Sequence, residues 1–128
     1  MSDHYSFSVP LVPPSVNHYK MPNRRGGWFI TKEAQAFVDA VGIFANQASI
    51  PRPIAGEFYD VTLNVYQARA KFLRGDSDNM EKVAFDSLTK AGVIRDDRYI
   101  TRHTHRRIRV DAASQERTEY IIRGIEEP

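Results

Sequence analysis

The sequence contains no cysteine, so disulfide bonds and thiolate chemistry are excluded and a reducing compartment is permitted. It also lacks any run of about 18 apolar residues, and its first residues, MSDHYSFSVP, lack the basic and apolar regions of a signal peptide. We therefore expect no membrane contact and a cytoplasmic location. A strong excess of charge is missing too, because 18 Lys and Arg against 16 Asp and Glu leave a formal net charge of +2. A net charge this small is not, by itself, evidence for a polyanionic partner.

The composition is that of an ordinary globular protein, with 41% hydrophobic and 27% charged residues. A chain of 128 residues is long enough for one hydrophobic core and too short for two independent ones. We therefore expect a single domain over residues 1–128.

Alternating apolar residues predict strands near residues 5–11, 58–67, 99–110 and 117–125. Two amphipathic helices are expected, the first capped by Thr31 and the second by Asp78 with Glu81 in a capping box, and Gly92 ends the second. Residues 13–30 are typical of a long irregular loop. The last two strands are expected to form a hairpin. This pattern predicts an α/β (α+β) fold with a small mixed β-sheet packed against two main helices.

Positive charge gathers in three places despite the small net charge. From Arg98 to Arg109 the chain has five arginines and two histidines with no carboxylate, and two further groups lie in the segments around residues 17–25 and 69–74. Such clusters are suited to phosphate backbones, although a solvated strand face or loop explains them equally. The candidates for contact with DNA are Asn17, Tyr19, Lys20, Arg24, Arg25, Arg69, Lys71, Arg74 and Arg102.

Acidic residues flank the second predicted helix. Asp76 and Asp78 are two positions apart, so in an extended segment both carboxylates point to one side and can share a hard cation such as Mg²⁺. Asp97, with Asp96 as a further candidate, would return from beyond the helix to complete the ligand set. The structural alternative is that Asp78 caps the helix while the other three acids lie in polar turns.

Lys82 lies four residues after Asp78 and four before Asp86, so all three share one helical face. One interpretation is a row of ion pairs that contribute roughly 0.2–0.5 kcal/mol each. The other places the ammonium beside a phosphate, where it offsets charge that develops in a transition state. The spacing leaves both open.

His103 and His105 share one face of the predicted basic strand. Two imidazoles without a third ligand are weak evidence for a transition metal. Phosphate contact or simple exposure fits them better.

The segment DSDNMEKVAFDSLTKAGVIRDD, residues 76–97, closely resembles the central motif of RusA-like Holliday junction resolvases. It has D-x-D-N, a lysine four residues after the second acid, F-D-x-L, a G-V turn and a terminal D-D, and PPSVNHY near the N-terminus is also similar. The resemblance implies that Asp76, Asp78 and Asp97 are catalytic acids that bind magnesium and that Lys82 is the catalytic lysine. It further implies a homodimer that introduces paired nicks into four-way DNA junctions.

The interpretation is therefore an endodeoxyribonuclease that requires Mg²⁺, with Mn²⁺ as a possible substitute, and that acts on branched DNA. Two other classes stay open at this point. A magnesium phosphohydrolase would act on nucleotides and ignore branched DNA. A non-catalytic DNA-binding module would bind a junction with or without metal and never nick it.

Overall fold

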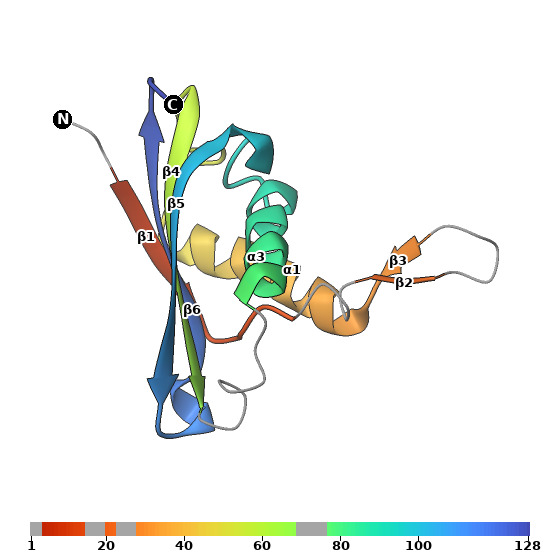
Figure 1. Ribbon diagram of the computed structural model, residues 1–128. Helices are drawn as coiled ribbons and strands as arrows, with labels where there is room; N and C mark the ends of the chain where they lie inside the picture. Colours follow the sequence, from red (N-terminus) through yellow and green to blue (C-terminus); the bar gives the residue numbers. More distant parts are fainter. Residues whose placement is uncertain (1–3, 15–19, 23–27, 69–76) are drawn as a thin grey trace.

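A computed structural model describes residues 4–14, 20–22, 28–68 and 77–128. Its main sheet has four strands in the order β1-β6-β4-β5, and a separate two-stranded sheet pairs β2 with β3. Two helices, α1 and α3, lie on one side of the main sheet (Figure 1). The strands are β1 (His4–Val9), β2 (Lys20–Pro22), β3 (Trp28–Ile30), β4 (Phe58–Ala68), β5 (Ile100–Val110) and β6 (Arg117–Ile125). The helices are α1 (Lys32–Gln47), α3 (Ser77–Lys90) and the short 3₁₀ turns η2 (Asp97–Tyr99) and η3 (Ala113–Gln115).

The fold class predicted from the sequence is confirmed, since the sheet is mixed and packs against two main helices. β4 and β5 are parallel, while β6 runs antiparallel to both β1 and β4. The expected hairpin of the last two strands is wrong, because β4 lies between β5 and β6. The reason is the connection through α3, which returns β5 to the sheet parallel to β4 as in a β-α-β unit. The η3 connection then carries the chain past β4 to β6.

The hydrophobic core lies between the sheet and the two helices. Val61, Leu63 and Val65 of β4 are fully buried on the helix side, as their alternation predicts. Tyr120 of β6 donates its hydroxyl hydrogen to the carbonyl of Ala84 at 3.0 Å, which ties α3 to the sheet. Full burial raises the pKa of this phenol, because the charged form would lose its hydration. The helices are therefore held on one face of the sheet.

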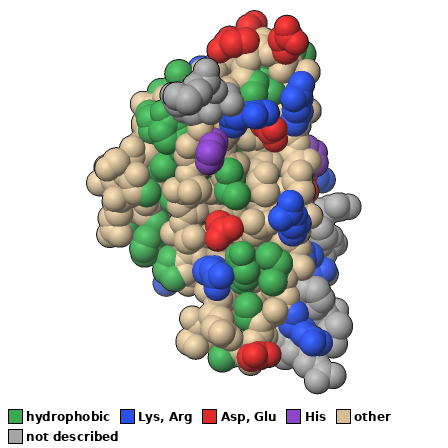
Figure 2. All heavy atoms as spheres, turned by 90° about the vertical axis from the view of Figure 1, so that its left-hand side faces the viewer, with side chains coloured by type: hydrophobic (Ala, Val, Ile, Leu, Met, Phe, Trp, Pro, Cys, Tyr) green, Lys and Arg blue, Asp and Glu red, His purple; other side chains and the backbone are tan. Residues whose placement is uncertain are grey.

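In the described part of the chain no helix covers the opposite face of the sheet. Figure 2 shows that face, with apolar side chains in separate patches and most of the visible Lys and Arg side chains toward its right-hand edge. Arg123 of β6 forms an ion pair with Asp60 of β4 there, at 3.2 Å.

The first helix begins where the sequence predicts. The hydroxyl of Thr31 accepts a hydrogen bond from the amide of Ala34 at 3.2 Å, which satisfies one of the free donors at the helix N-terminus. The segment before it is more regular than the expected loop, since β2 and β3 pair as an antiparallel hairpin with Met21 opposite Phe29. This hairpin projects away from the main sheet beside the start of α1 (Figure 1).

Helix α3 begins at Ser77, so the expectation that Asp78 precedes the helix as its cap is wrong. Asp78 instead lies in the first turn of the helix. The predicted C-terminal end is confirmed, because Gly92 adopts a left-handed φ of +76°. None of the helices within the described ranges is both long and apolar enough to cross a membrane.

Candidate active site at the junction of α3, η2 and β5

A small cavity of about 190 Å³ opens where α3 meets the start of β5. It is lined by Glu81, Lys82 and Phe85 of α3, Asp97 of η2, and Ile100 and His103 of β5. Lys82 and Asp97, which lie 15 positions apart in the sequence, thus reach one cavity. The connection after α3 explains this, because the chain turns back there and brings η2 and β5 alongside the helix.

The turn that carries Asp97 is fixed by Arg95. The guanidinium of Arg95 donates hydrogen bonds to the carbonyls of Gly56 and Glu57, at 2.9 and 2.6 Å, and lies over the ring of Tyr99 at 4.2 Å from its centroid. This contact ties the turn to the segment that precedes β4. No signal in the sequence singled out Arg95, because its partners are backbone oxygens about 39 residues away.

Asp96 and Asp97 lie side by side but in different environments. The amide of Arg98 donates a hydrogen bond to Asp96 Oδ1 at 3.0 Å, and this bond, together with one shared with Asp97, lowers the pKa of Asp96. Partial desolvation raises the pKa of Asp97, and a shared hydrogen bond with Asp96 and repulsion from Asp96 and Asp86 raise it further. The site therefore crowds negative charge on Asp97, which a bound cation would relieve.

Glu81 makes contacts that the sequence did not predict. Its Oε1 lies 3.1 Å from Nδ1 of His103 and its Oε2 lies 3.3 Å from Nδ1 of His105. The expected capping-box role of Glu81 is therefore wrong, since both carboxylate oxygens face β5. Simple exposure is wrong for His105, whose side chain is 5% exposed. The two alternating histidines were a usable signal, but the acid that faces them becomes evident only once α3 is known to cross over β5.

Of the three acids predicted to bind metal, the structure describes the side chain of Asp97 alone. Asp76 lies outside the described residues, and Asp78 lies in α3 with a side chain that is not described. Among the side chains that the structure does describe, no three of His, Asp and Glu are placed to hold a metal ion. The prediction that Asp76, Asp78 and Asp97 share one ion stays a prediction.

Most of the residues predicted to contact DNA lie outside the described part of the chain. Arg102 is exposed on β5, and Lys20 lies in β2 with a side chain that is not described. Within the described part of the chain β5 pairs with β4 alone, so its basic residues line an edge of the sheet. Charge on an edge strand also discourages pairing with another sheet. Outside the described residues lie Asn17, Tyr19, Arg24, Arg25, Arg69, Lys71 and Arg74.

Comparison with known proteins gives one consistent match. A family model described as "Endodeoxyribonuclease RusA" matches residues 10–121. The crossover junction endodeoxyribonuclease RusA of Escherichia coli strain K12 is 37% identical over 93 residues, which cover 73% of each chain. Its counterpart from Escherichia coli O139:H28 is 35% identical over 96 residues, 75% of this chain and 76% of the relative. The protein of the same name from Enterobacteria phage 82 is 35% identical over 99 residues, 73% of each chain.

Proposed function

This chain belongs to the endodeoxyribonuclease RusA family, and from that membership we propose that it resolves four-way DNA junctions by hydrolysing paired phosphodiester bonds. The observation that carries the proposal is the cavity that joins Lys82 and Asp97 beside a basic edge strand. One wall supplies a cation and another a carboxylate, which are the groups that hydrolysis of a phosphodiester requires.

We propose that Asp76, Asp78 and Asp97 hold a divalent ion, Mg²⁺ or Mn²⁺. The chemistry of the donors fits, because Mg²⁺ prefers carboxylate oxygens, and partial burial together with the neighbouring carboxylates raises the pKa of Asp97 in a way that a bound cation would offset. When bound, such an ion polarises the scissile phosphate and lowers the pKa of a coordinated water. Asp96 would act as a positioning residue, since it caps the turn on which Asp97 lies.

Lys82 is assigned to the substrate. Lys82 lines the same cavity as Asp97, so its ammonium can reach the phosphate and offset the charge that grows on the phosphate oxygens during attack. An ion pair between Lys82 and Asp86 is the structural alternative. Asp86 has an ion pair with Lys90 at 3.5 Å, which makes Lys82 less important for holding the helix together.

The DNA arms would be held by the basic groups predicted from the sequence, of which Arg102 on β5 is exposed in the described part. We propose that two copies of the chain, each a single domain over residues 1–128, act on one junction, because resolution needs two cuts. Action on DNA also favours the cytoplasm as the location.

The test incubates the purified protein with a synthetic four-way junction, a matched linear duplex or a nucleotide, each with Mg²⁺, Mn²⁺ or chelator. We expect paired nicks in the junction only, and only with metal. Hydrolysis of the nucleotide instead would identify a phosphohydrolase, and metal-independent binding without nicks would identify a binding module. Either result would overturn the proposal.

Variants of the acids sharpen this test. Asp78→Asn and Asp97→Asn should abolish cleavage while junction binding stays equal or becomes tighter, because each change removes a metal ligand and a negative charge near phosphate. Asp39→Asn is the matched control, since this acid lies on α1 and accepts a hydrogen bond from Gln35 at 2.8 Å. Metal-dependent cleavage by the folded Asp78 variant would remove that residue from the site.

A further inference from the structure

The carboxylate of Glu81 joins two histidines of β5, and both contacts are made through Nδ1. The two histidines differ in exposure. The side chain of His105 is 5% exposed and that of Glu81 21%, whereas that of His103 is 48% exposed. The cluster thus runs from a buried imidazole through a half-buried carboxylate to an imidazole in contact with water.

His103 also lines the cavity that contains Lys82 and Asp97. The ring of Phe85 meets its ring edge-on, with centroids 5.6 Å apart and an interplanar angle of 79°. Glu81 and Phe85 are one helical turn apart on α3, so a single face of the helix holds the imidazole in place. A side chain fixed in this way loses little entropy when it contacts a substrate.

The contact with Glu81 selects the form of the imidazole. A carboxylate accepts hydrogen bonds, so Nδ1 of a neutral His103 carries the hydrogen and donates it to Glu81 Oε1. The lone pair then resides on Nε2, which can accept a proton. When the ring accepts a proton there, the adjacent carboxylate stabilises the imidazolium that forms.

We propose that His103 is the general base of this site, with Glu81 and His105 as positioning residues. The inference rests on the proposed phosphodiester hydrolysis. As the oxygen of water forms its bond to phosphorus, Nε2 of His103 takes the proton that the water loses. The bond between phosphorus and the leaving sugar oxygen breaks, the electron pair stays on that oxygen, and solvent supplies its proton. The imidazolium then returns its own proton to solvent.

The competing explanation is that the cluster only fastens α3 to β5. Other contacts already hold the helix, however, including the hydrogen bond from Tyr120 to Ala84 and the buried side chains of Met80, Val83 and Leu88. A structural role also gives no reason for His103 to be half exposed and to line the cavity. The two explanations differ in their response to added imidazole and to pH.

The first measurement is single-turnover junction cleavage by His103→Ala, with and without added imidazole. We expect the rate to fall roughly 10²–10³-fold, as for loss of a general base, with unchanged junction affinity. Imidazole should restore the rate several-fold and saturably, and wild-type protein in the same imidazole corrects for any removal of metal. His4→Ala is the matched control, since His4 is on β1 at the opposite edge of the sheet, and it should cleave like wild type without responding to imidazole.

The second measurement is the pH profile of the same cleavage. The wild-type rate should rise with pH and then level off, as for a general base that must be deprotonated, and His103→Ala should lose that rise. The titratable groups that face His103 are Glu81 and Lys82 of α3, Asp97 of η2 and His105 of β5. A variant within twofold of wild type, an unchanged pH profile or a rate that imidazole does not rescue would overturn the assignment.

The third measurement needs no DNA. Nitrogen chemical shifts of His103 should report hydrogen on Nδ1 in the wild type and a shift toward hydrogen on Nε2 in Glu81→Gln, because the amide holds the ring less firmly. A wild-type ring with its hydrogen on Nε2 would overturn the base role. A wild-type protein that cleaves no branched DNA would instead overturn the proposed function and the base role together, whereas an active His103→Ala overturns the base role alone.

Discussion

β4 and β5 are parallel neighbours of 11 residues each, yet they perform different tasks on the same face of the sheet. The central residues of β4 that face the helices are apolar and fully buried, and those opposite them on β5 are polar. In register, Val61, Leu63 and Val65 lie opposite His103, His105 and Arg107. One strand spacing, about 4.8 Å, therefore separates the row that stabilises the fold from the polar row whose first member, His103, lines the cavity.

The largest effect is expected from Leu63→Ala in β4. Leu63 is fully buried, so truncation removes its transfer free energy and leaves a cavity, which should lower the free energy of unfolding by about 2–5 kcal/mol. Denaturant unfolding measures the change. Thr104→Ala on β5 is the control, because this side chain is exposed and its loss should cost less than about 0.5 kcal/mol. Equal losses at the two sites would remove the difference between the strands.

Lys82→Ala should have the opposite outcome to Leu63→Ala, a loss of activity without a loss of stability. Lys82 lines the cavity and is exposed, so we expect cleavage to slow about 10²–10³-fold while the melting temperature stays nearly constant. Lys90→Ala serves as the control at the other end of the same helix, where Lys90 is paired with Asp86. A lost fold in the Lys82 variant would favour a structural ion pair over a catalytic lysine.

The contrast between the strands also explains what the sequence could predict. Thr31, Gly92 and the alternation of β4 are local signals, and the structure confirms the helix start, the helix end and the strand that they predict. The strand that pairs with β5 cannot be predicted from the local sequence. The short segment before β6 resembles a hairpin turn, but in the fold it passes the end of β4, so that β4 lies between β5 and β6. There the amide of Ala68 donates a hydrogen bond to Glu116 at 2.9 Å.

The candidate site also has features that the sequence predicts and features that it does not. The resemblance of the central motif to the RusA-like resolvases predicted that Lys82 and Asp97 belong to one site, and both line one cavity. The contacts of Glu81 with the two histidines depend on how α3 crosses β5, which no spacing within either segment encodes.

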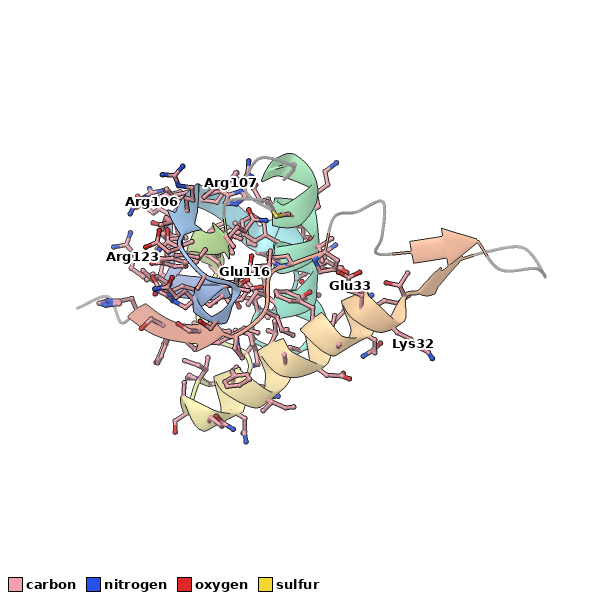
Figure 3. The ribbon with its side chains drawn as sticks, turned by 90° about the horizontal axis from the view of Figure 1, so that it is seen from below. Lys32, Glu33, Arg106, Arg107, Glu116 and Arg123 are labelled. Atoms are coloured by element: carbon pink, nitrogen blue, oxygen red, sulfur yellow. The ribbon has the colours of Figure 1, made fainter. Side chains whose placement is uncertain are left out.

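Arg102→Gln tests whether the open face of β5 also contacts DNA. If Arg102 pairs with a phosphate, the slope of log affinity against log salt should become shallower by about 0.9, with the cleavage pattern unchanged. Figure 3 shows that Arg123 of β6 lies on the same side of the molecule as Arg106 and Arg107 of β5, opposite Lys32 and Glu33 at the start of α1. Arg123 therefore provides a control on the basic side of the molecule. Arg123→Gln is the control, because its charge is already paired with Asp60. An unchanged slope for Arg102→Gln would place that residue outside the interface.

The smallest effect concerns the stability of the fold, which the ionised and partly buried carboxylate of Asp97 lowers. Because its pKa is raised, the native chain holds that proton more tightly than the unfolded chain, so this contribution to stability is present in acid and is lost as pH rises through the raised value. At pH 7 in chelator, Asp97→Asn should therefore raise the melting temperature, by only about 1–2 °C because solvent screens the group. Mg²⁺ should stabilise the wild type and not the variant, since an ion that binds the native state alone raises its stability. Scanning calorimetry measures these melting temperatures, with Asp39→Asn as the control. If Mg²⁺ raised the melting temperature of the wild type and of the Asp97 variant equally, the ion would bind elsewhere.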